Sequence, residues 1–557
     1  MAHPRALASW SAPVLWRFTS HYATRFFCLL LFAASLNVRV LAQSPLIHRL
    51  SPLGIPAGRT TELKIVGERV SGITDGWLGL PGTEIVKTNE SSLLISTAPD
   101  AAGVCALRIA TTNGASELSM IFIDDLPTTA ASGTNNSPQT AQSIRPPVAI
   151  DGVSRELGFD YYSFDAKRGE VISFEVVASR LGSRLDPVLR ILDAKGREVA
   201  FNEDAPGAGR DCRLQFRPPA TGQYLAEVRD ITYGGGPQYY YRLRAGKFAF
   251  PTCTYPLAGE DDAELRVLSS AGDARKPLAC RMRPAPYTAV NGDFVALHSL
   301  DQPQITELEP NNSAAQGTTI SLPTVLNGRF EKADDRDWFQ FDADKDERWI
   351  FRSRSRSLGS PCDVFFEIRD EAGKEVATAI VGGPQDASAT NTLKAAGRYH
   401  LVAKELTHRG GPDLAYQIEI ERFRPGFALF VDDDKIEAKN GTEVSLSVAC
   451  LRYDFNDKID LKVDGLPGAF SVEGARFDEK KTNTVLKIKV PASAHPGTLI
   501  TFAVFGKSGV VEARASTIPA LRRNFPLILY PPSELSGVIA LGITAGTPAP
   551  EPKRRRG

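Results

Sequence analysis

The stretch Asp160–Ala166, which reads DYYSFDA, returns 177 residues later as Asp337–Ala343, which reads DWFQFDA. Further matches keep the offset of 177 residues, except for the last two pairs, where the second copy is two residues shorter and the offset is 175. The matched pairs are Leu181–Ser183 with Leu358–Ser360, Asp186 with Asp363, Asp193–Val199 with Asp370–Val376, Gly222–Tyr224 with Gly397–Tyr399, and Gly235–Pro237 with Gly410–Pro412. Matches kept over about 80 residues indicate a duplicated domain, in which we define a first repeat (128–246) and a second repeat (304–423).

The rest of the chain has the pattern of β-strands and turns. Apolar and polar residues alternate in Val444–Val448, Ile459–Val463 and Leu486–Val490, which is typical of antiparallel strands with one buried face. Turn pairs such as Asn440-Gly441 and Asp464-Gly465 separate these runs, as they do in β-sandwiches. No stretch longer than a dozen residues has a convincing helical period. The sequence therefore predicts an all-β protein, a tandem array of about five β-sandwich modules that are jelly-roll-like and immunoglobulin-like.

Length and composition limit the possible functions. The chain has 557 residues, which at roughly 100–200 residues per domain predicts three to five domains. Hydrophobic residues make up 42% and charged residues 23%, a globular balance that excludes a chain disordered throughout. Basic and acidic residues number 65 each, so no net charge attracts nucleic acid, and we expect no nucleic-acid partner.

Residues 1–42 have the pattern of a signal peptide. Arg17 and Arg25 precede the apolar run Phe26–Ala34, and Val40–Ala42 supplies a small-residue cleavage site. The run is short for a membrane span, although an uncleaved anchor stays an alternative because Arg39 follows the run. Cleavage removes four arginines and leaves 61 basic and 65 acidic residues. We therefore expect an exported, mildly acidic protein in the periplasm, at the cell surface or secreted, with no transmembrane span after the signal peptide.

Six cysteines remain after cleavage, and they are widely scattered. Cys253 and Cys280 fall within one short module and form the one plausible disulfide. The other four are expected to be small buried side chains. The sequence has no Cys-x-x-Cys pair, which argues against a zinc ribbon or thioredoxin chemistry.

The repeat resembles the bacterial pre-peptidase C-terminal (PPC) domain family. The family pattern is an acidic opening, an aromatic strand led by Asp, a hairpin with Asp and Gly, and a late Gly-x-Tyr strand. The second repeat carries all four parts, in Glu309–Asn312, Asp337–Phe341, Asp363–Gly373 and Gly397–Tyr399. The first repeat has Thr134–Ser137 in place of the acidic opening. The resemblance covers about 230 residues and implies small, non-catalytic sandwiches of the kind attached to secreted proteases.

The flanking segments resemble other exported modules, and their order is similar to that of large sandwich-rich proteins of planctomycete-like bacteria. Residues 43–127 resemble an immunoglobulin-like domain of the IPT/TIG kind. Small polar residues at 128–136, and the join at 300–312, are expected to be linkers. The remaining expected segments are a short immunoglobulin-like module (247–303), an immunoglobulin-like domain (424–531), and a final strand with a disordered basic tail (532–557).

A search for catalytic motifs finds none in the sequence. The Gly-x-Ser-x-Gly elbow, the His-Glu-x-x-His helix and the subtilase motifs are all missing. Gly506-Lys507-Ser508 lacks the earlier glycine of a phosphate loop and is interpreted as a hairpin turn. We therefore expect no catalytic residues, although the resemblance to PPC domains leaves a peptidase of unrecognised type as an alternative.

Two polar or aromatic runs have competing interpretations. Tyr239-Tyr240-Tyr241 is either a platform for stacking sugar or peptide rings or, as we favour, a strand with Tyr241 inward like Tyr416. Arg352, Arg354 and Arg356 lie on one face of a strand, which favours a solvated face over a binding site for an acidic polymer.

One set of side chains in the second repeat predicts a metal site. Carboxylate and amide oxygens from two adjacent loops suit Ca²⁺, which takes six to eight oxygen ligands. The candidate ligands are Glu307, Glu309, Asn311, Asn312, Asp334, Asp335 and Asp337. Similar segments hold calcium in the collagen-binding relatives, so the resemblance implies calcium here, while a solvated acidic turn stays the alternative. The first repeat has Gly133 and Asn135 and keeps only Asp160, so we expect only the second repeat to bind.

These observations favour a non-catalytic, exported, structural or adhesive protein. It would bind an extracellular protein or polysaccharide at the cell surface. The alternatives are an accessory subunit of a secreted hydrolase and a secreted, subtilase-associated peptidase.

Overall fold

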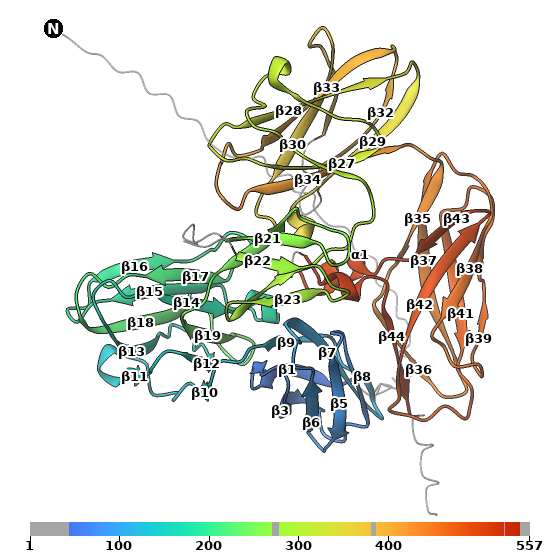
Figure 1. Cartoon of the computed structure of the whole chain (residues 1–557). Helices are drawn as coiled ribbons and strands as arrows, with labels where there is room; N and C mark the ends of the chain where they lie inside the picture. The colour runs from blue at the N-terminus through green and yellow to red at the C-terminus, as the bar shows by residue number, and fades with distance from the viewer. Residues whose placement is uncertain (1–43, 270–277, 380–385, 529, 546–557) are drawn as a thin grey trace, which may run out of the picture. The chain divides into compact units, whose positions relative to one another are not determined.

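The computed structural model describes residues 44–269, 278–379, 386–528 and 530–545. The predicted signal peptide and most of the predicted basic tail lie outside this range. Strands dominate the described residues (Figure 1), and the prediction of an all-β tandem array of sandwiches is confirmed. The helices in these ranges are short: α1 (Ile518–Asn524) and the 3-10 helices η1 (Pro138–Thr140), η2 (Ser179–Leu181), η3 (Ala314–Gln316), η4 (Arg356–Leu358) and η5 (Ser533–Leu535). None of the helices in the described residues has the length and apolar character needed to cross a membrane.

Residues 46–123 form two sheets with the strand orders β1-β3-β6-β5 and β2-β9-β7-β4, and β8 pairs with β7. Leu63, Leu93, Ile109 and Ile121 fill the core because alternate residues of these strands point to one face. The strands are β1 (Leu46–Ser51), β2 (Gly54–Ile55), β3 (Thr60–Glu68), β4 (Asp75–Leu78), β5 (Thr83–Thr88), β6 (Ser92–Thr97), β7 (Gly103–Thr111), β8 (Gly114–Ala115) and β9 (Ser119–Ile123).

The first repeat is a sandwich of two five-stranded sheets. Their strand orders are β10-β12-β19-β14-β17 and β11-β13-β18-β15-β16. Phe164, Phe174 and Tyr224 are among the aromatic residues of the core between the sheets. The strands are β10 (Thr128–Ala130), β11 (Gln142–Ser143), β12 (Val148–Val153), β13 (Asp160–Ala166), β14 (Ile172–Val177), β15 (Pro187–Leu192), β16 (Glu198–Asn202), β17 (Cys212–Phe216), β18 (Gly222–Asp230) and β19 (Tyr240–Gly246).

The second repeat has the same topology, strand for strand. Its sheets have the orders β25-β27-β34-β29-β32 and β26-β28-β33-β30-β31. Phe341, Phe351 and Tyr399 take the places of the three aromatic residues named in the first repeat. The strands are β25 (Gln304–Thr306), β26 (Thr318–Thr319), β27 (Thr324–Arg329), β28 (Arg336–Ala343), β29 (Glu347–Arg354), β30 (Val364–Asp370), β31 (Glu375–Ala379), β32 (Ser388–Leu393), β33 (Gly397–Glu405) and β34 (Ala415–Arg422).

Between the repeats, two small sheets stand where the sequence predicts a shortened immunoglobulin-like module. One has the order β20-β21-β22 and the other is the hairpin β23-β24. The strands are β20 (Pro251–Tyr255), β21 (Glu264–Ser269), β22 (Leu278–Arg281), β23 (Tyr287–Val290) and β24 (Asp293–Ala296).

The suggested Cys253–Cys280 disulfide is not formed, and both thiols are free. Cys253 lies on β20 opposite Leu268, and Cys280 lies on β22 opposite Leu265. Because β21 runs between them, their backbones are two strand spacings apart, about 10 Å. A disulfide needs Cα atoms within about 7 Å.

Residues 426–544 form the last sandwich. Its sheets have the orders β35-β37-β41-β39 and β36-β44-β42-β38-β40, and β43 pairs with β42 in a hairpin whose turn, Gly509-Val510, directly follows the predicted Gly506–Ser508, which belong to β42. The expected final strand is β44, which joins this sandwich by pairing with β36 and β42. The strands are β35 (Gly426–Val431), β36 (Lys435–Lys439), β37 (Glu443–Tyr453), β38 (Ile459–Asp464), β39 (Ser471–Glu473), β40 (Arg476–Phe477), β41 (Asn483–Lys489), β42 (Leu499–Ser508), β43 (Val511–Arg514) and β44 (Ile539–Thr544).

The two predicted linkers differ from the structure. Residues 128–130 form β10, which pairs in parallel with β12, and residues 304–306 form β25, which pairs in parallel with β27. Both segments are therefore edge strands of the repeats. This arrangement places the residues that follow β25 beside the start of β28, where the candidate metal ligands lie.

Candidate metal centre

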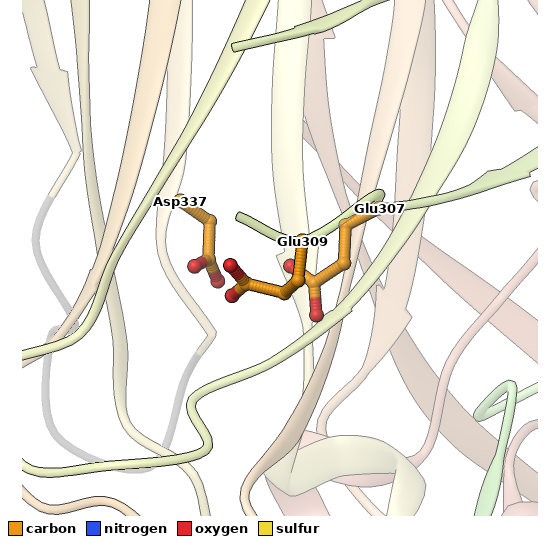
Figure 2. Close-up of side chains that lie close together, drawn as sticks. All are labelled: Glu307, Glu309 and Asp337. Atoms are coloured by element: carbon orange, nitrogen blue, oxygen red, sulfur yellow. The ribbon is translucent and has the colours of Figure 1, made fainter. Parts of the chain in front are cut away.

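Three carboxylates of the second repeat come together at one end of its sandwich. Glu307 and Glu309 follow β25, and Asp337 is the second residue of β28. One carboxylate oxygen from each residue lies within 4.8 Å of the others. Figure 2 shows the three side chains pointing toward one another from these two segments.

Asp337 is completely buried. Its Oδ2 accepts a hydrogen bond from the Tyr416 hydroxyl at 2.6 Å, whereas its Oδ1 has no hydrogen-bond partner among the described residues. Glu307 is half-buried, and its Oε1 accepts the backbone N–H of Arg329 at 2.7 Å. Glu309 is exposed, and its Oε2 accepts the backbone N–H of Asn311 at 3.0 Å. Backbone donors thus fix two of the carboxylates next to the buried one.

The electrostatics of this cluster favour a positive charge. Burial raises the pKa of Glu307 to about 7, and the nearby charge of Glu309 acts in the same direction. Burial, and then the charge of Glu307, raise the pKa of Asp337 well above its usual range. Both shifts mean that the charged forms are unfavourable in this place, so a bound cation would stabilise them.

The donor set fits a hard cation. Asn311 is completely buried, and its Oδ1, like Asp337 Oδ1, has no hydrogen-bond partner in the part of the chain that the structure describes. Buried oxygens without partners are costly and are commonly satisfied by water or an ion. Carboxylate and amide oxygens are the ligands that Ca²⁺ prefers. Glu307, Glu309 and Asp337 therefore form a partial coordination shell. Asn311 directs its amide nitrogen to Glu307 Oε2 at 3.3 Å, so it would have to turn its amide group to add a fourth oxygen.

The other predicted ligands lie outside this group or at its margin. Asp334, with φ +62°, is exposed and pairs with Nδ1 of His408 at 2.8 Å. Asp335 is buried, its Oδ2 accepts the backbone N–H of Glu331 at 2.9 Å, and its Oδ1 has no hydrogen-bond partner among the described residues. Asn312 directs its amide nitrogen, not its oxygen, to Glu309 at 3.3 Å.

Tyr416 was missed as part of the site, although the repeat contains a signal for it. Tyr416 and Tyr241 are both kept, as are Asp337 and Asp160, and in each repeat the tyrosine hydroxyl bonds to the aspartate. Two residues kept together in a duplicated domain predict such a contact.

The tyrosines at 239–241 and the arginines at 352 and 354 take part in packing and ion pairing within the repeats. Tyr241 is completely buried, as is Tyr416, so the inward orientation is confirmed. Arg352 pairs with Glu421 at 2.9 Å and Arg354 with Glu419 at 3.9 Å, both on the neighbouring strand β34. Cross-strand pairs of this kind support the solvated-face interpretation for these two arginines. Arg356 does not share that face, because it lies beyond β29 in η4, where it pairs with Asp363 at 2.8 Å.

Comparisons with known proteins match parts of the chain. No protein-family model matches the sequence. A segment of 80 residues, 14% of this chain, is 39% identical to a probable subtilase-type serine protease of Deinococcus radiodurans, of which it covers only 10%.

Among solved structures, the pre-peptidase C-terminal domain of a Bacillus anthracis collagenase aligns with 22% of this chain and 100% of its own length, at 14% identity and a TM-score of 0.16. Domains 1–6 of the surface layer protein SbsC align with 91% of this chain and 55% of theirs, at 9% identity and a TM-score of 0.15.

Proposed function

We propose that this protein is a non-catalytic, exported, structural or adhesive protein that binds an extracellular protein or polysaccharide, and that its second repeat holds a calcium ion. The observation that carries the structural role is that buried charged side chains form ion pairs between sandwiches. Five of these charged residues, Arg108, Asp124, Arg242, Arg244 and Asp434, form ion pairs that join one sandwich to another.

The first such contact involves β19 of the first repeat. Arg242 is completely buried, and its Nε lies 2.9 Å from Asp124 Oδ2, directly after β9 of the N-terminal sandwich. Arg242 Nη1 also lies 2.6 Å from Asp151 Oδ1, and Arg244 Nε lies 3.1 Å from Asp124 Oδ2. Removing one partner from a buried pair leaves an uncompensated charge, so the loss of any one of these residues should destabilise this contact strongly.

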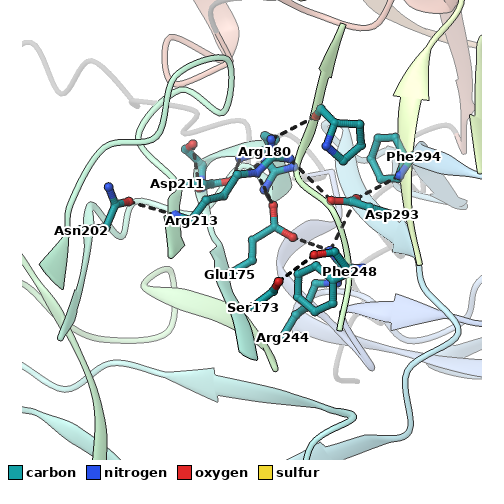
Figure 3. Close-up of polar contacts among 12 residues, drawn as sticks. Ser173, Glu175, Arg180, Asn202, Asp211, Arg213, Arg244, Phe248, Asp293 and Phe294 are labelled. Atoms are coloured by element: carbon teal, nitrogen blue, oxygen red, sulfur yellow. Dashed lines mark hydrogen bonds and ion pairs between the residues drawn. The ribbon is translucent and has the colours of Figure 1, made fainter. Parts of the chain in front are cut away.

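Figure 3 shows how this contact continues toward the hairpin β23-β24. Glu175 is completely buried and pairs with Arg180 at 2.6 Å, with Arg213 at 2.8 Å and with Arg244. Arg244 also lies 3.5 Å from Asp293, the first residue of β24. The buried charges therefore link three segments of the chain.

A similar pair connects the N-terminal and last sandwiches. Arg108 of β7 pairs with Asp434, and both side chains are buried. Asn524 of α1 donates to Asp434 Oδ1 at 2.8 Å, and Asp75 Oδ2 accepts the backbone N–H of Leu499 at 2.9 Å. Such cross-links suit a protein whose task is to hold modules in fixed positions.

The surface of the first repeat supports a binding role. Leu157 is 76% exposed and Tyr233 is 40% exposed, and Phe159 lies 5.9 Å from Tyr233 between ring centroids. The second repeat has Asp334 and His408 in place of Leu157 and Tyr233. Single exposed apolar residues are common, but Leu157 and Tyr233 are adjacent, with the N–H of Leu157 bonded to the oxygen of Tyr233 at 2.9 Å, and a contiguous apolar patch is what marks an interaction site.

The calcium proposal rests on the cluster described above. Glu307, Glu309, Asp337 and Asn311 would hold the ion, which would supply the positive charge that the buried carboxylates lack. The chain's own residues orient these oxygens through Tyr416 and the backbone of β27.

A second candidate is an accessory subunit of a secreted hydrolase. The segment that resembles a subtilase-type protease favours it. The same match leaves one more alternative, that the chain is itself a peptidase of unrecognised type.

Two experiments test these proposals. Purified residues 43–557 should not hydrolyse casein or gelatin, and hydrolysis blocked by a protease inhibitor would contradict the non-catalytic role. Pull-downs from the native host should recover a partner with the unaltered chain and lose it with Leu157→Asp/Tyr233→His, which copies the second repeat. A hydrolase as the captured partner would favour the accessory-subunit alternative.

A further inference from the structure

The two repeats place an aspartate at the same position with different surroundings. Asp160 pairs in register with Val228 of β18, and Asp337 pairs with Ala403 of β33. Oδ2 of each accepts a tyrosine hydroxyl, from Tyr241 at 2.7 Å and from Tyr416 at 2.6 Å. The difference lies in Oδ1, which has no hydrogen-bond partner among the described residues in Asp337.

In the first repeat, an arginine satisfies that oxygen. Arg155 donates from Nη2 to Asp160 Oδ1 at 3.2 Å. Its Nη1 donates to the backbone oxygen of Gly133 at 2.8 Å. One guanidinium group thus bridges two segments, the start of β13 and the segment after β10.

Gly133 occupies the position of Glu309. The backbone oxygen of Asn135 accepts the N–H of Tyr161 at 2.8 Å, and that of Asn311 accepts the N–H of Trp338 at 2.9 Å, which aligns the two segments. Gly133 and Glu309 each lie two residues before these asparagines. Arg155 therefore bridges the two positions at which the second repeat has the carboxylates of Glu309 and Asp337.

The same alignment places Ala131 at the position of Glu307. The N–H of Ala131 bonds to the oxygen of Asp151 at 2.9 Å, and the N–H of Glu307 bonds to the oxygen of Asn327 at 2.9 Å. Compared with the second repeat, the first has lost two acids and gained a cationic side chain.

We propose that the guanidinium of Arg155 is the resident cation of the first repeat, in the place where the second repeat binds a divalent cation. The inference rests on the calcium site proposed above. Charge neutralises the buried aspartate in both repeats, through a fixed side chain in one and an exchangeable ion in the other. Response to calcium is therefore confined to the second repeat.

The second repeat has a lysine where the first has Arg155, but that lysine points elsewhere. A Cβ on Gly235 would lie 2.1 Å from the carbonyl carbon of Arg155, and one on Gly410 would lie 1.9 Å from that of Lys332, so the two positions correspond. The Lys332 side chain is 68% exposed, and its Nζ lies 3.8 Å from Asp335. Lys332 is thus a matched control for Arg155.

Calorimetry of the full chain tests the role of Arg155. In a chelator, Arg155→Ala should lower the melting temperature of one unfolding transition by several degrees, because Asp160 keeps its burial and loses its cation. Lys332→Ala should leave every transition within about one degree of the wild type. An unchanged Arg155→Ala protein would overturn the proposal.

A second set of variants tests whether the effect of calcium on melting can be transferred from the second repeat to the first. Asp337→Asn silences the second repeat and should abolish the effect of calcium on melting. Adding Arg155→Ala and Ala131→Glu to that variant should restore a rise of a few degrees with millimolar calcium. If the triple variant melts cooperatively without that rise, the equivalence of guanidinium and ion is wrong. If the unaltered chain itself ignores calcium while Arg155→Ala is destabilised, the calcium site fails and the structural role of Arg155 remains.

Discussion

Tyr416 donates its phenolic hydrogen to Oδ2 of Asp337, with the two oxygens 2.6 Å apart and both residues completely buried. The tyrosine ring also stacks on Phe330, at 4.7 Å between centroids. The ring holds its place by packing, so its hydroxyl can be removed with little loss of shape.

Tyr416→Phe should therefore destabilise the second repeat, because Asp337 loses the hydrogen bond from the tyrosine hydroxyl. Loss of the donor leaves a buried carboxyl group poorly satisfied, which costs about 1–3 kcal/mol. The matched control is Tyr241→Phe in a Tyr162→Phe parent, because the buried Tyr162 hydroxyl lies 2.5 Å from that of Tyr241 and the second repeat has Phe339 in its place. It should cost less than Tyr416→Phe, because Asp160 retains the guanidinium of Arg155. Thermal unfolding of both variants measures the difference, and equal losses would contradict this account.

Asp293 predicts a pH dependence of stability. Burial, and then the charge of Glu175, raise the pKa of Asp293 to about 6. The folded state then binds more protons than the unfolded state between about pH 4 and pH 6, so the free energy of unfolding falls as pH rises through that window. Asp293→Asn has no carboxyl group to titrate and avoids this loss. Relative to the wild type, its free energy of unfolding should therefore rise by roughly 1–2 kcal/mol from pH 4.5 to pH 7.5.

Urea unfolding at the two pH values measures that gain. Asp262→Asn is the control, because Asp262 is in the same part of the chain, its side chain is 85% exposed, and it pairs only weakly with Arg281 at 3.3 Å. If Asp293→Asn differs from the wild type in free energy of unfolding by the same amount at pH 4.5 and at pH 7.5, the carboxyl group of Asp293 does not titrate between these pH values.

Arg242 predicts a large effect of a single buried charge. Arg242→Ala leaves Asp124 and Asp151 without one of their partners and should cost about 3–5 kcal/mol in the free energy of unfolding. Arg197→Ala removes an arginine that is 72% exposed and should cost less than about 1 kcal/mol. Denaturant midpoints of both variants compare the two, and similar losses would argue against a structural role for the buried pairs.

Much of the fold follows from the sequence because its signals are local or repeated. The match of Asp160–Ala166 with Asp337–Ala343 predicts two sandwiches of one topology, and alternation in Val444–Val448 predicts a strand of the last one. The error at 128–136 has a physical reason. Small polar residues resemble a linker, but Thr128–Ala130 pairs with a strand about 20 residues later, which local composition cannot reveal.

The candidate site was predictable only in part. The acids at 307, 309 and 337 follow from the acidic segment and the aspartate loop. Asp334 is predicted with them because it is their neighbour in the loop, but its contact with His408 depends on a residue 74 positions away, which the loop sequence does not reveal. The contact between Arg155 and Asp160 joins a loop residue to a strand through side-chain direction, for which no sequence spacing gives a signal.

The most direct test of the central claim is calorimetry of the full chain with calcium and with a chelator, for the wild type and for Asp337→Asn. With calcium at tenfold its Kd, linkage adds about 1.4 kcal/mol, which should raise the melting temperature of one transition by several degrees. That rise should disappear in Asp337→Asn and persist in Asp342→Asn, the control on the same strand, whose side chain is 74% exposed. No rise in the wild type, or an equal rise in Asp337→Asn, would contradict a calcium site in the second repeat.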